Sequence, residues 1–241
     1  MLFIIVFFKS KGKIQYIMLM KKNNFVILAH ARSGSTTLFH MFENQGVKIF
    51  CEPFNKDSIM KYLIHWGKND FYSAIEMLLS EYKGFKHLCG FTTIDQTIFI
   101  KEKCNTIFLY RENILNTAVS LVLAFKTNVW TNLQKSSDYG KDKIHINPES
   151  VQSSINHLAN FSNIKDNNCF SVSYEKLYYS SKEEQKKIIE EMFEFTECKI
   201  ENYSKIERLL DVKANKINPE NWSDIISNWD EVKSKVVLPK M

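Results

Sequence analysis

Arginine is the residue type that first points to chemistry in this sequence. Of 32 basic residues other than histidine, only Arg32, Arg111 and Arg208 are arginines, and the others are lysines. A planar guanidinium can bind two phosphate or sulfate oxygens at once, which an ammonium cannot do. Because lysine is the default cation here, each arginine is expected to have a specific role. Arg32 and Arg111 lie in the two segments most typical of anion sites.

The first of these segments reads Arg32-Ser33-Gly34-Ser35-Thr36-Thr37 and joins a predicted strand to a predicted helix. Small residues let the backbone curl closely around an anion, and the unpaired N–H groups of a first helical turn point toward it. The hydroxyl groups add donors, and Arg32 adds positive charge. Two interpretations are open from this segment alone: an anion-binding loop, or an ordinary Ser/Thr cap of the helix.

The best-known phosphate loop, G-x-x-x-x-G-K-[ST], does not fit this segment. Counting back from Gly34, the first glycine position holds Ala29, and the lysine position holds Ser35. The cation instead precedes the glycine, at Arg32. The mismatch argues against an ATPase or GTPase of the usual kind.

The second segment begins where a predicted buried strand, 106–110, ends at Arg111. Ligands of open α/β sheets bind at this end of the strands. The helix predicted over 114–127 carries a polar stripe whose spacing puts its members on one face, Asn113, Asn116, Thr117 and Ser120. The alternative interpretation is a capped helix with a small residue at a packing contact.

These segments need a scaffold, and the apolar patterning predicts one. Short apolar runs predict strands at 25–29, 47–51, 84–89, 106–110 and 169–173. Helical periodicity predicts helices that begin near 36 and that span 57–66, 71–82, 114–127, 149–164 and 182–195, and the polar stretch 130–147 is predicted to be a mobile loop. Alternating strands and helices predict an α/β fold of the P-loop-like kind, with three layers and a central parallel sheet flanked by helices.

The composition is that of one globular domain covering residues 1–241. Hydrophobic residues make up 44% and charged residues 24%, the net charge is +5, and no apolar run reaches the roughly 18–20 residues of a membrane span. The basic charge is spread out, which argues against nucleic-acid binding. Five scattered cysteines indicate reduced thiols, no zinc site and a cytoplasmic protein. Residues 1–19 are interpreted as a non-native or disordered extension, with Met20 as an alternative start.

Together the motifs resemble those of sulfotransferases that use 3'-phosphoadenosine 5'-phosphosulfate (PAPS) and release adenosine 3',5'-bisphosphate. The run from Arg32 to Leu38 resembles the family's 5'-phosphosulfate loop, and Arg111 with Ser120 resembles its 3'-phosphate motif. Tyr174, in Ser173-Tyr174-Glu175, is similar to a tyrosine that lies near the adenine. The ordered resemblance covers about residues 24–195. The Lys-Gly-rich C-terminal loop of the animal cytosolic enzymes is missing from the sequence, and residues 218–232 replace it.

The subgroup resembled most is the bacterial trehalose 2-sulfotransferase type. Arg111 and Ser120 stand nine positions apart, one more than in the animal cytosolic enzymes. The stretch from Ala124 to Trp130 is similar to a Thr-Gly-x-Trp-like stretch of that subgroup. The resemblance implies a carbohydrate or other small-molecule acceptor with a free hydroxyl, and no metal.

Sulfuryl transfer needs a base for the acceptor's proton, and the resemblance offers two. Glu52, in Glu52-Pro53-Phe54, matches an acidic residue of the trehalose type, and His87 resembles the histidine of the Lys-x-His-Leu stretch in cytosolic enzymes. One residue is missing between Lys86 and His87, which alters the alternation of their side chains along a strand. We therefore favour Glu52 as the base, with Arg32 neutralising charge on the bridging oxygen.

Two other functions stay open from the sequence. A nucleotide or small-molecule kinase with a degenerate loop is one, although the best strand ends in Arg111 and not in an acidic residue suited to magnesium. A non-catalytic nucleotide-binding module is the other, and it would not need Glu52 or His87. Four aromatic side chains could line an acceptor pocket, although aromatic residues at such spacings are more often core residues: Tyr62, Trp66, Trp130 and Tyr139. The acceptor's identity and the oligomeric state cannot be read from these patterns.

Overall fold

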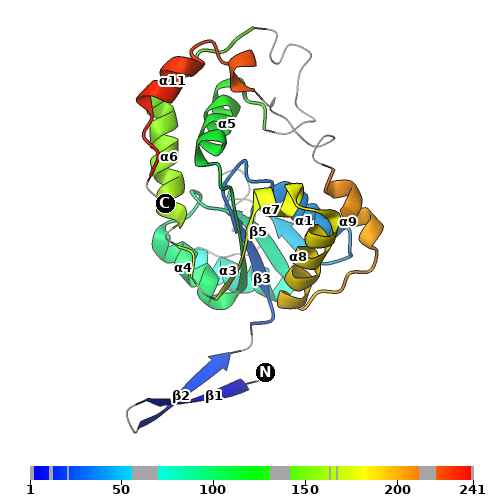
Figure 1. Cartoon of the computed structure of the whole chain (residues 1–241). Helices are drawn as coiled ribbons and strands as arrows, with labels where there is room; N and C mark the ends of the chain where they lie inside the picture. The colour runs from blue at the N-terminus through cyan, green and yellow to red at the C-terminus, as the bar shows by residue number, and fades with distance from the viewer. Residues whose placement is uncertain are drawn as a thin grey trace.

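The fold is built on a five-stranded parallel sheet (Figure 1). The computed structural model describes residues 3–10, 13–20, 22–55, 70–130, 142–162, 164–166, 168–211 and 221–239. Across the sheet, the strands lie in the order β4 (Ile49–Cys51), β5 (Gly84–Leu88), β3 (Phe25–Ala29), β6 (Asn105–Tyr110) and β7 (Cys169–Ser173). All neighbouring pairs are parallel. The predicted α/β class with a central parallel sheet is confirmed.

Helices cover both faces of this sheet. The side chains of β3 alternate between the two faces, and all of them are buried because each face is covered. Phe25 and Ile27 face α1 (Ser35–Glu43), α7 (Tyr174–Tyr179), α8 (Lys182–Phe195) and α9 (Tyr203–Leu209). Val26 faces α3 (Phe71–Glu81) and α4 (Ile94–Lys103). The result is three layers, with every strand's carboxyl end at one edge of the sheet.

A second apolar cluster lies beyond that carboxyl edge. It joins α5 (Ile114–Thr127), α6 (Pro148–Ser162), the short η2 (Trp222–Asp224) and α11 (Trp229–Lys235), as Figure 1 shows. Phe161 of α6 stacks on Phe108 of β6 at a ring separation of 4.7 Å. This contact packs α6, one of the helices of the cluster, against the sheet.

The amino edge of the sheet is closed by side chains that bind backbone carbonyls. Lys22 Nζ donates to the carbonyls of Lys101 at 2.6 Å and Cys104 at 3.2 Å. Asn24 Nδ2 donates to the carbonyls of Leu79 and Tyr82. On this side a separate antiparallel pair, β1 (Phe3–Ser10) and β2 (Lys13–Met20), extends away from the sheet (Figure 1).

Most predicted elements have their predicted positions. The strands at 25–29 and 169–173 and the helices at 114–127 and 182–195 have the predicted bounds. The strand predicted over 47–51 is shorter and begins at Ile49, and the helix predicted over 149–164 spans 148–162. The predicted helix 57–66 and most of the predicted loop 130–147 lie outside the described residues. No prediction was made for α4, α7, α9, η2 or α11, and the segment 1–19, interpreted above as a non-native or disordered extension, contains β1 and most of β2.

Candidate functional site

The loop between β3 and α1 leaves the start of α1 without a side-chain cap. Gly34 occupies the cap position with a φ of 84°, and Arg32 has a φ of 70°, so the chain turns tightly in the left-handed region. Ser33 Oγ does not cap the helix but donates to the carbonyl of His30 at 2.7 Å. By contrast, Asn113 caps α5 and Ser181 caps α8 through their side chains. The interpretation of this segment as an ordinary Ser/Thr cap of the helix is therefore wrong, because no side chain caps α1.

Arg32 links this loop to α5. Its Nε donates to Ser120 Oγ at 2.9 Å, and a terminal nitrogen donates to the carbonyl of Trp130. Within the polar stripe of α5, Ser120 is the member that meets Arg32. Asn116 instead accepts a hydrogen bond from the indole of Trp222 at 2.7 Å. The two predicted anion segments, which are 88 positions apart at this contact, thus touch directly.

Tyr174 lies against the loop at Gly34, and Arg111 stacks on the Tyr174 ring. The Arg111 guanidinium carbon lies 4.0 Å from the centre of the Tyr174 ring, and Arg111 Nε is buried without a hydrogen-bond partner among the described residues. A Cβ at Gly34 would lie 2.8 Å from the Tyr174 ring, so glycine lets the loop and this ring approach closely. Tyr178 adds a hydrogen bond from its hydroxyl to the carbonyl of Gly34 at 3.0 Å.

Glu175, next to Tyr174, fixes the start of α5. One carboxylate oxygen accepts from the backbone N–H of Glu112 at 2.9 Å, and the other accepts from that of Asn113 at 3.5 Å. A carboxylate at a helix N-terminus is also favoured by the helix dipole. Two adjacent residues therefore position the site: Tyr174 contacts Arg111, and Glu175 holds the start of the helix that carries Ser120.

Glu52 forms an ion pair with a lysine that faces the loop. Lys86 Nζ lies 2.6 Å from Glu52 Oε1 and donates to Thr36 Oγ1 at 2.9 Å. The Lys86 side chain is 2% exposed and that of Glu52 is 20% exposed. Glu52 has a φ of 51°, an unusual value for a residue with a side chain. This backbone turn interrupts the strand alternation after β4, and the Glu52 carboxylate meets the lysine of the neighbouring strand.

His87 points to the other face of the sheet. Its register partner is Leu28, whereas that of Lys86 is Ile27, which faces α1. His87 Nε2 is hydrogen-bonded to Thr92 Oγ1 at 2.8 Å, and its ring packs against Phe54. Burial lowers the pKa of His87 to about 3. The structure does not bring His87 to the group formed by Arg32, Arg111, Tyr174 and Glu52.

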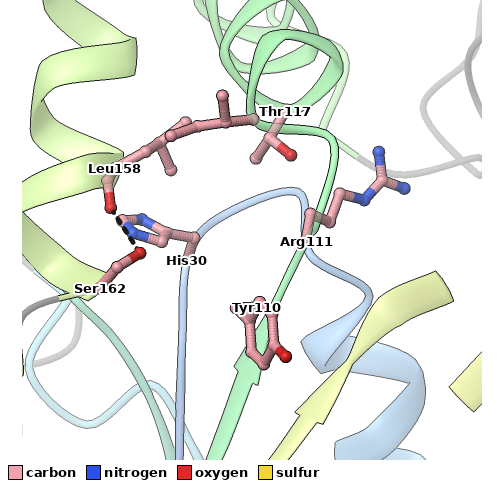
Figure 2. Close-up of a pocket in the computed structure, with 7 residues that line it drawn as sticks. His30, Tyr110, Arg111, Thr117, Leu158 and Ser162 are labelled. Atoms are coloured by element: carbon pink, nitrogen blue, oxygen red, sulfur yellow. Dashed lines mark hydrogen bonds between the residues drawn. The ribbon is translucent and has the colours of Figure 1, made fainter. Parts of the chain in front are cut away.

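A small pocket lies between the ends of β3 and β6 and the helices α5 and α6 (Figure 2). It is lined by His30, Tyr110, Arg111, Thr117, Leu158 and Ser162, among others. Figure 2 shows the Arg111 guanidinium extending away from His30. The ring of His30 is hydrogen-bonded to the Leu158 carbonyl, and burial is the main cause that lowers its pKa to about 3.

Sequence reasoning did not identify Lys86 as a functional residue. The available signal was a lysine inside a short apolar strand, since a lysine is almost never fully buried unless it is paired. Tyr178 and Glu175 were also missed, because their partners are far away in the sequence.

The remaining predicted residues are distributed as follows. Tyr62, Trp66 and Tyr139, proposed for an acceptor pocket, lie outside the described residues. Trp130 is half-buried, and its ring meets Phe125 edge-on at 4.9 Å.

Within the part of the chain that the structure describes, no group of three or more His, Cys, Asp or Glu side chains could hold a metal ion. Among the same residues, no helix is both long and apolar enough to cross a membrane.

Comparison with known proteins gives distant likenesses among solved structures alone. No family model matches the sequence, and no curated protein matches it. Among solved structures, the chain is similar to mouse sulfotransferase SULT7A1 complexed with PAP, at 15% sequence identity and a TM-score of 0.46. The match covers 80% of this chain and 64% of that one, so this chain spans less than two thirds of the neighbour's length. A likeness at this level assigns neither a family nor an activity.

Proposed function

We propose that this protein is a sulfotransferase that moves a sulfuryl group from PAPS to a hydroxyl of a carbohydrate or other small molecule. The observation that carries the proposal is the convergence of four separate segments at the carboxyl edge of the sheet. Arg32 touches Ser120, Gly34 abuts Tyr174, Tyr174 stacks on Arg111, and Glu52 is linked to Thr36 through Lys86. These contacts join the segments that resemble the sulfotransferase motifs.

The side chains present fit a donor with two anionic groups and a purine. The uncapped start of α1, with Arg32 and the residues Ser33, Gly34, Ser35, Thr36 and Thr37, suits a 5'-phosphosulfate. Arg111, whose buried Nε has no partner among the described residues, and Ser120 suit the 3'-phosphate. The half-buried ring of Tyr174 offers an apolar surface for the adenine.

The chemistry assigned to the chain is positioning and charge stabilisation, as in phosphoryl transfer. The donor supplies an activated sulfuryl group. Glu52 accepts the proton of the acceptor hydroxyl as the new S–O bond forms at that oxygen. Arg32 neutralises the negative charge that develops on the oxygen from which the sulfur departs. Both of these roles use residues at the carboxyl edge of the sheet. The sequence resemblance to the trehalose type supports a carbohydrate acceptor.

Ligand stabilisation tests this proposal directly. Adenosine 3',5'-bisphosphate at 100 times its dissociation constant should raise the free energy of unfolding by about 2.7 kcal/mol, in the absence of magnesium. The same titration with ADP, with and without magnesium, tests the kinase alternative. A larger stabilisation by ADP with magnesium than by the bisphosphate would overturn the proposal in favour of a kinase.

A further inference from the structure

Lys86 contacts both the phosphate-type loop and the residue proposed as base. Its ammonium group lies 2.6 Å from Glu52 and donates to Thr36 Oγ1 at 2.9 Å. A third contact is made with the thiol of Cys51, its register partner in β4. An ammonium group has three protons to donate. These three neighbours therefore account for its donor capacity.

The placement of Lys86 is demanding. Its side chain is 2% exposed, and a buried ammonium group is tolerated only when charge and hydrogen bonds compensate its lost hydration. Glu52 supplies that charge from a backbone conformation with a φ of 51°, which is unfavourable for a residue with a side chain. Such backbone strain is typical of functional sites. Both features hold the carboxylate against the lysine at the edge of the loop.

The ion pair with Lys86 restricts Glu52 as a base. While Lys86 Nζ lies 2.6 Å from Glu52 Oε1, that carboxylate oxygen is engaged with the ammonium group and is not free to take a hydrogen bond from an acceptor hydroxyl. An anion bound in the adjoining loop would compete with the carboxylate for the same ammonium group, because Lys86 already reaches the loop at Thr36.

We propose that Lys86 is a positioning residue shared between Glu52 and the donor's 5' anion, so that donor binding weakens its hold on Glu52 and makes the base available. The inference rests on the proposed function. It links two events: the base is restrained before the donor arrives and is released when an acceptor can be used. No covalent step is involved, only a redistribution of hydrogen bonds around one ammonium group.

A double-mutant cycle on ligand binding tests the competition without an acceptor. The affinity for adenosine 3',5'-bisphosphate is measured by calorimetry, at one pH and salt concentration, for the unaltered chain, Glu52→Gln, Lys86→Met and the double variant. If Glu52 competes for Lys86, Glu52→Gln should tighten binding about five- to twenty-fold, in the range of coupling between contacting residues. In the Lys86→Met background the same change should alter the affinity less than about two-fold.

Simple repulsion between Glu52 and the ligand predicts another pattern. Glu52→Gln would then tighten binding as much in the Lys86→Met background as in the unaltered one, and that result would overturn the inference while leaving the proposed function intact. So would a Glu52→Gln variant that binds no more tightly than the unaltered chain. An unaltered chain that does not bind the bisphosphate at all would overturn both proposals.

The chain offers a matched ion pair as a control. Lys187 and Glu191 lie 3.9 Å apart on exposed positions of α8. Lys187→Met, Glu191→Gln and their combination should change the affinity for the bisphosphate less than about two-fold. If Lys86→Met does not fold, as judged by its thermal transition, Lys86→Gln completes the cycle, because it removes the charge but keeps a side-chain donor.

Discussion

At the scale of the single residue, the planar shape of the Arg111 side chain matters as well as its charge. The guanidinium stacks on Tyr174 at 4.0 Å, and planarity allows it to use its ring contact and its hydrogen-bonding edge together. A lysine at the same position would keep the charge and lose the planar fork.

Arg111→Lys should therefore weaken binding of adenosine 3',5'-bisphosphate by roughly 1.5–3 kcal/mol, the range for a charge-assisted contact. The affinity for 5'-AMP, which lacks the 3'-phosphate, should change much less. Calorimetric titration of both ligands measures the difference, and Arg208→Lys, an exposed arginine of α9, is the matched control. Equal losses for the two ligands would remove Arg111 from the 3'-phosphate site.

Glu52 and His87 make opposite predictions about the base. Glu52→Gln should lower turnover by about 10²–10⁴-fold, the usual contribution of a positioned base, without weakening nucleotide binding. His87→Asn should cost less than about ten-fold, because His87 points to the other face of the sheet and is hydrogen-bonded to Thr92. Steady-state rates with an acceptor found by screening sugars check this. A dead histidine variant beside an active glutamine variant would reverse the assignment.

At the scale of elements, α1 is bordered by two glycines with positive φ that differ in their surroundings. Gly34, before the helix, has a φ of 84° and leaves no room for a Cβ beside Tyr174, whereas Gly46, after the helix, has a φ of 77° and nothing within 4 Å. Alanine at either position should cost about 1–2 kcal/mol for the left-handed backbone.

Gly34→Ala should cost more than Gly46→Ala, because it must also displace the Tyr174 ring. It should reduce affinity for adenosine 3',5'-bisphosphate, which Gly46→Ala should leave unchanged. Urea unfolding gives the stabilities, and calorimetry gives the affinities. Equal effects of the two substitutions on both quantities would contradict a role for the contact between Gly34 and Tyr174.

Elements with clear periodicity were predictable from the sequence, and those with conflicting signals were not. The helix Ile114–Thr127 has a long apolar face and a side-chain cap, and its predicted bounds are correct. The helix Ile94–Lys103 was missed because its isoleucines and threonine favour strands. Its capping box, Thr93 with Gln96, was the signal that could have identified it.

The site was predictable where local motifs define it and unpredictable where distant contacts do. The loop around Gly34 and the strand end at Arg111 are visible in short stretches of sequence. The pairing of Lys86 with Glu52 depends on which strands are neighbours, and β4 lies beside β5 only in the folded sheet. The turn at Glu52 that enables this pairing has no local signature such as glycine or asparagine.

At the scale of the whole molecule, two buried histidines make stability depend on pH. Burial is the largest cause that lowers the pKa values of His30 and His87 to about 3, whereas both groups titrate near 6.5 when unfolded. Between these values the unfolded chain binds protons that the folded chain does not. The free energy of unfolding should therefore fall as the pH drops from about 6.5 toward 3.

At pH 5.5 each histidine should lower the free energy of unfolding by about 1.4 kcal/mol relative to neutral pH. Urea unfolding at pH 7.5 and 5.5 measures the total. His87→Asn should show a smaller loss than the unaltered chain over this interval, whatever its stability at pH 7.5. The same pH dependence in both proteins would show that His87 does not contribute.

The hydrogen bonds of Lys22 and Asn24 at the amino edge also have a practical meaning for the orientation of the molecule on a surface. The chain enters β3 at that edge, opposite the loops that contain Arg32, Glu52, Arg111 and Tyr174 (Figure 1). An affinity tag or a covalent tether placed before residue 22 therefore directs these loops away from a sensor chip or resin. Immobilised in this way, the protein presents these loops to the solution, where candidate ligands can be screened.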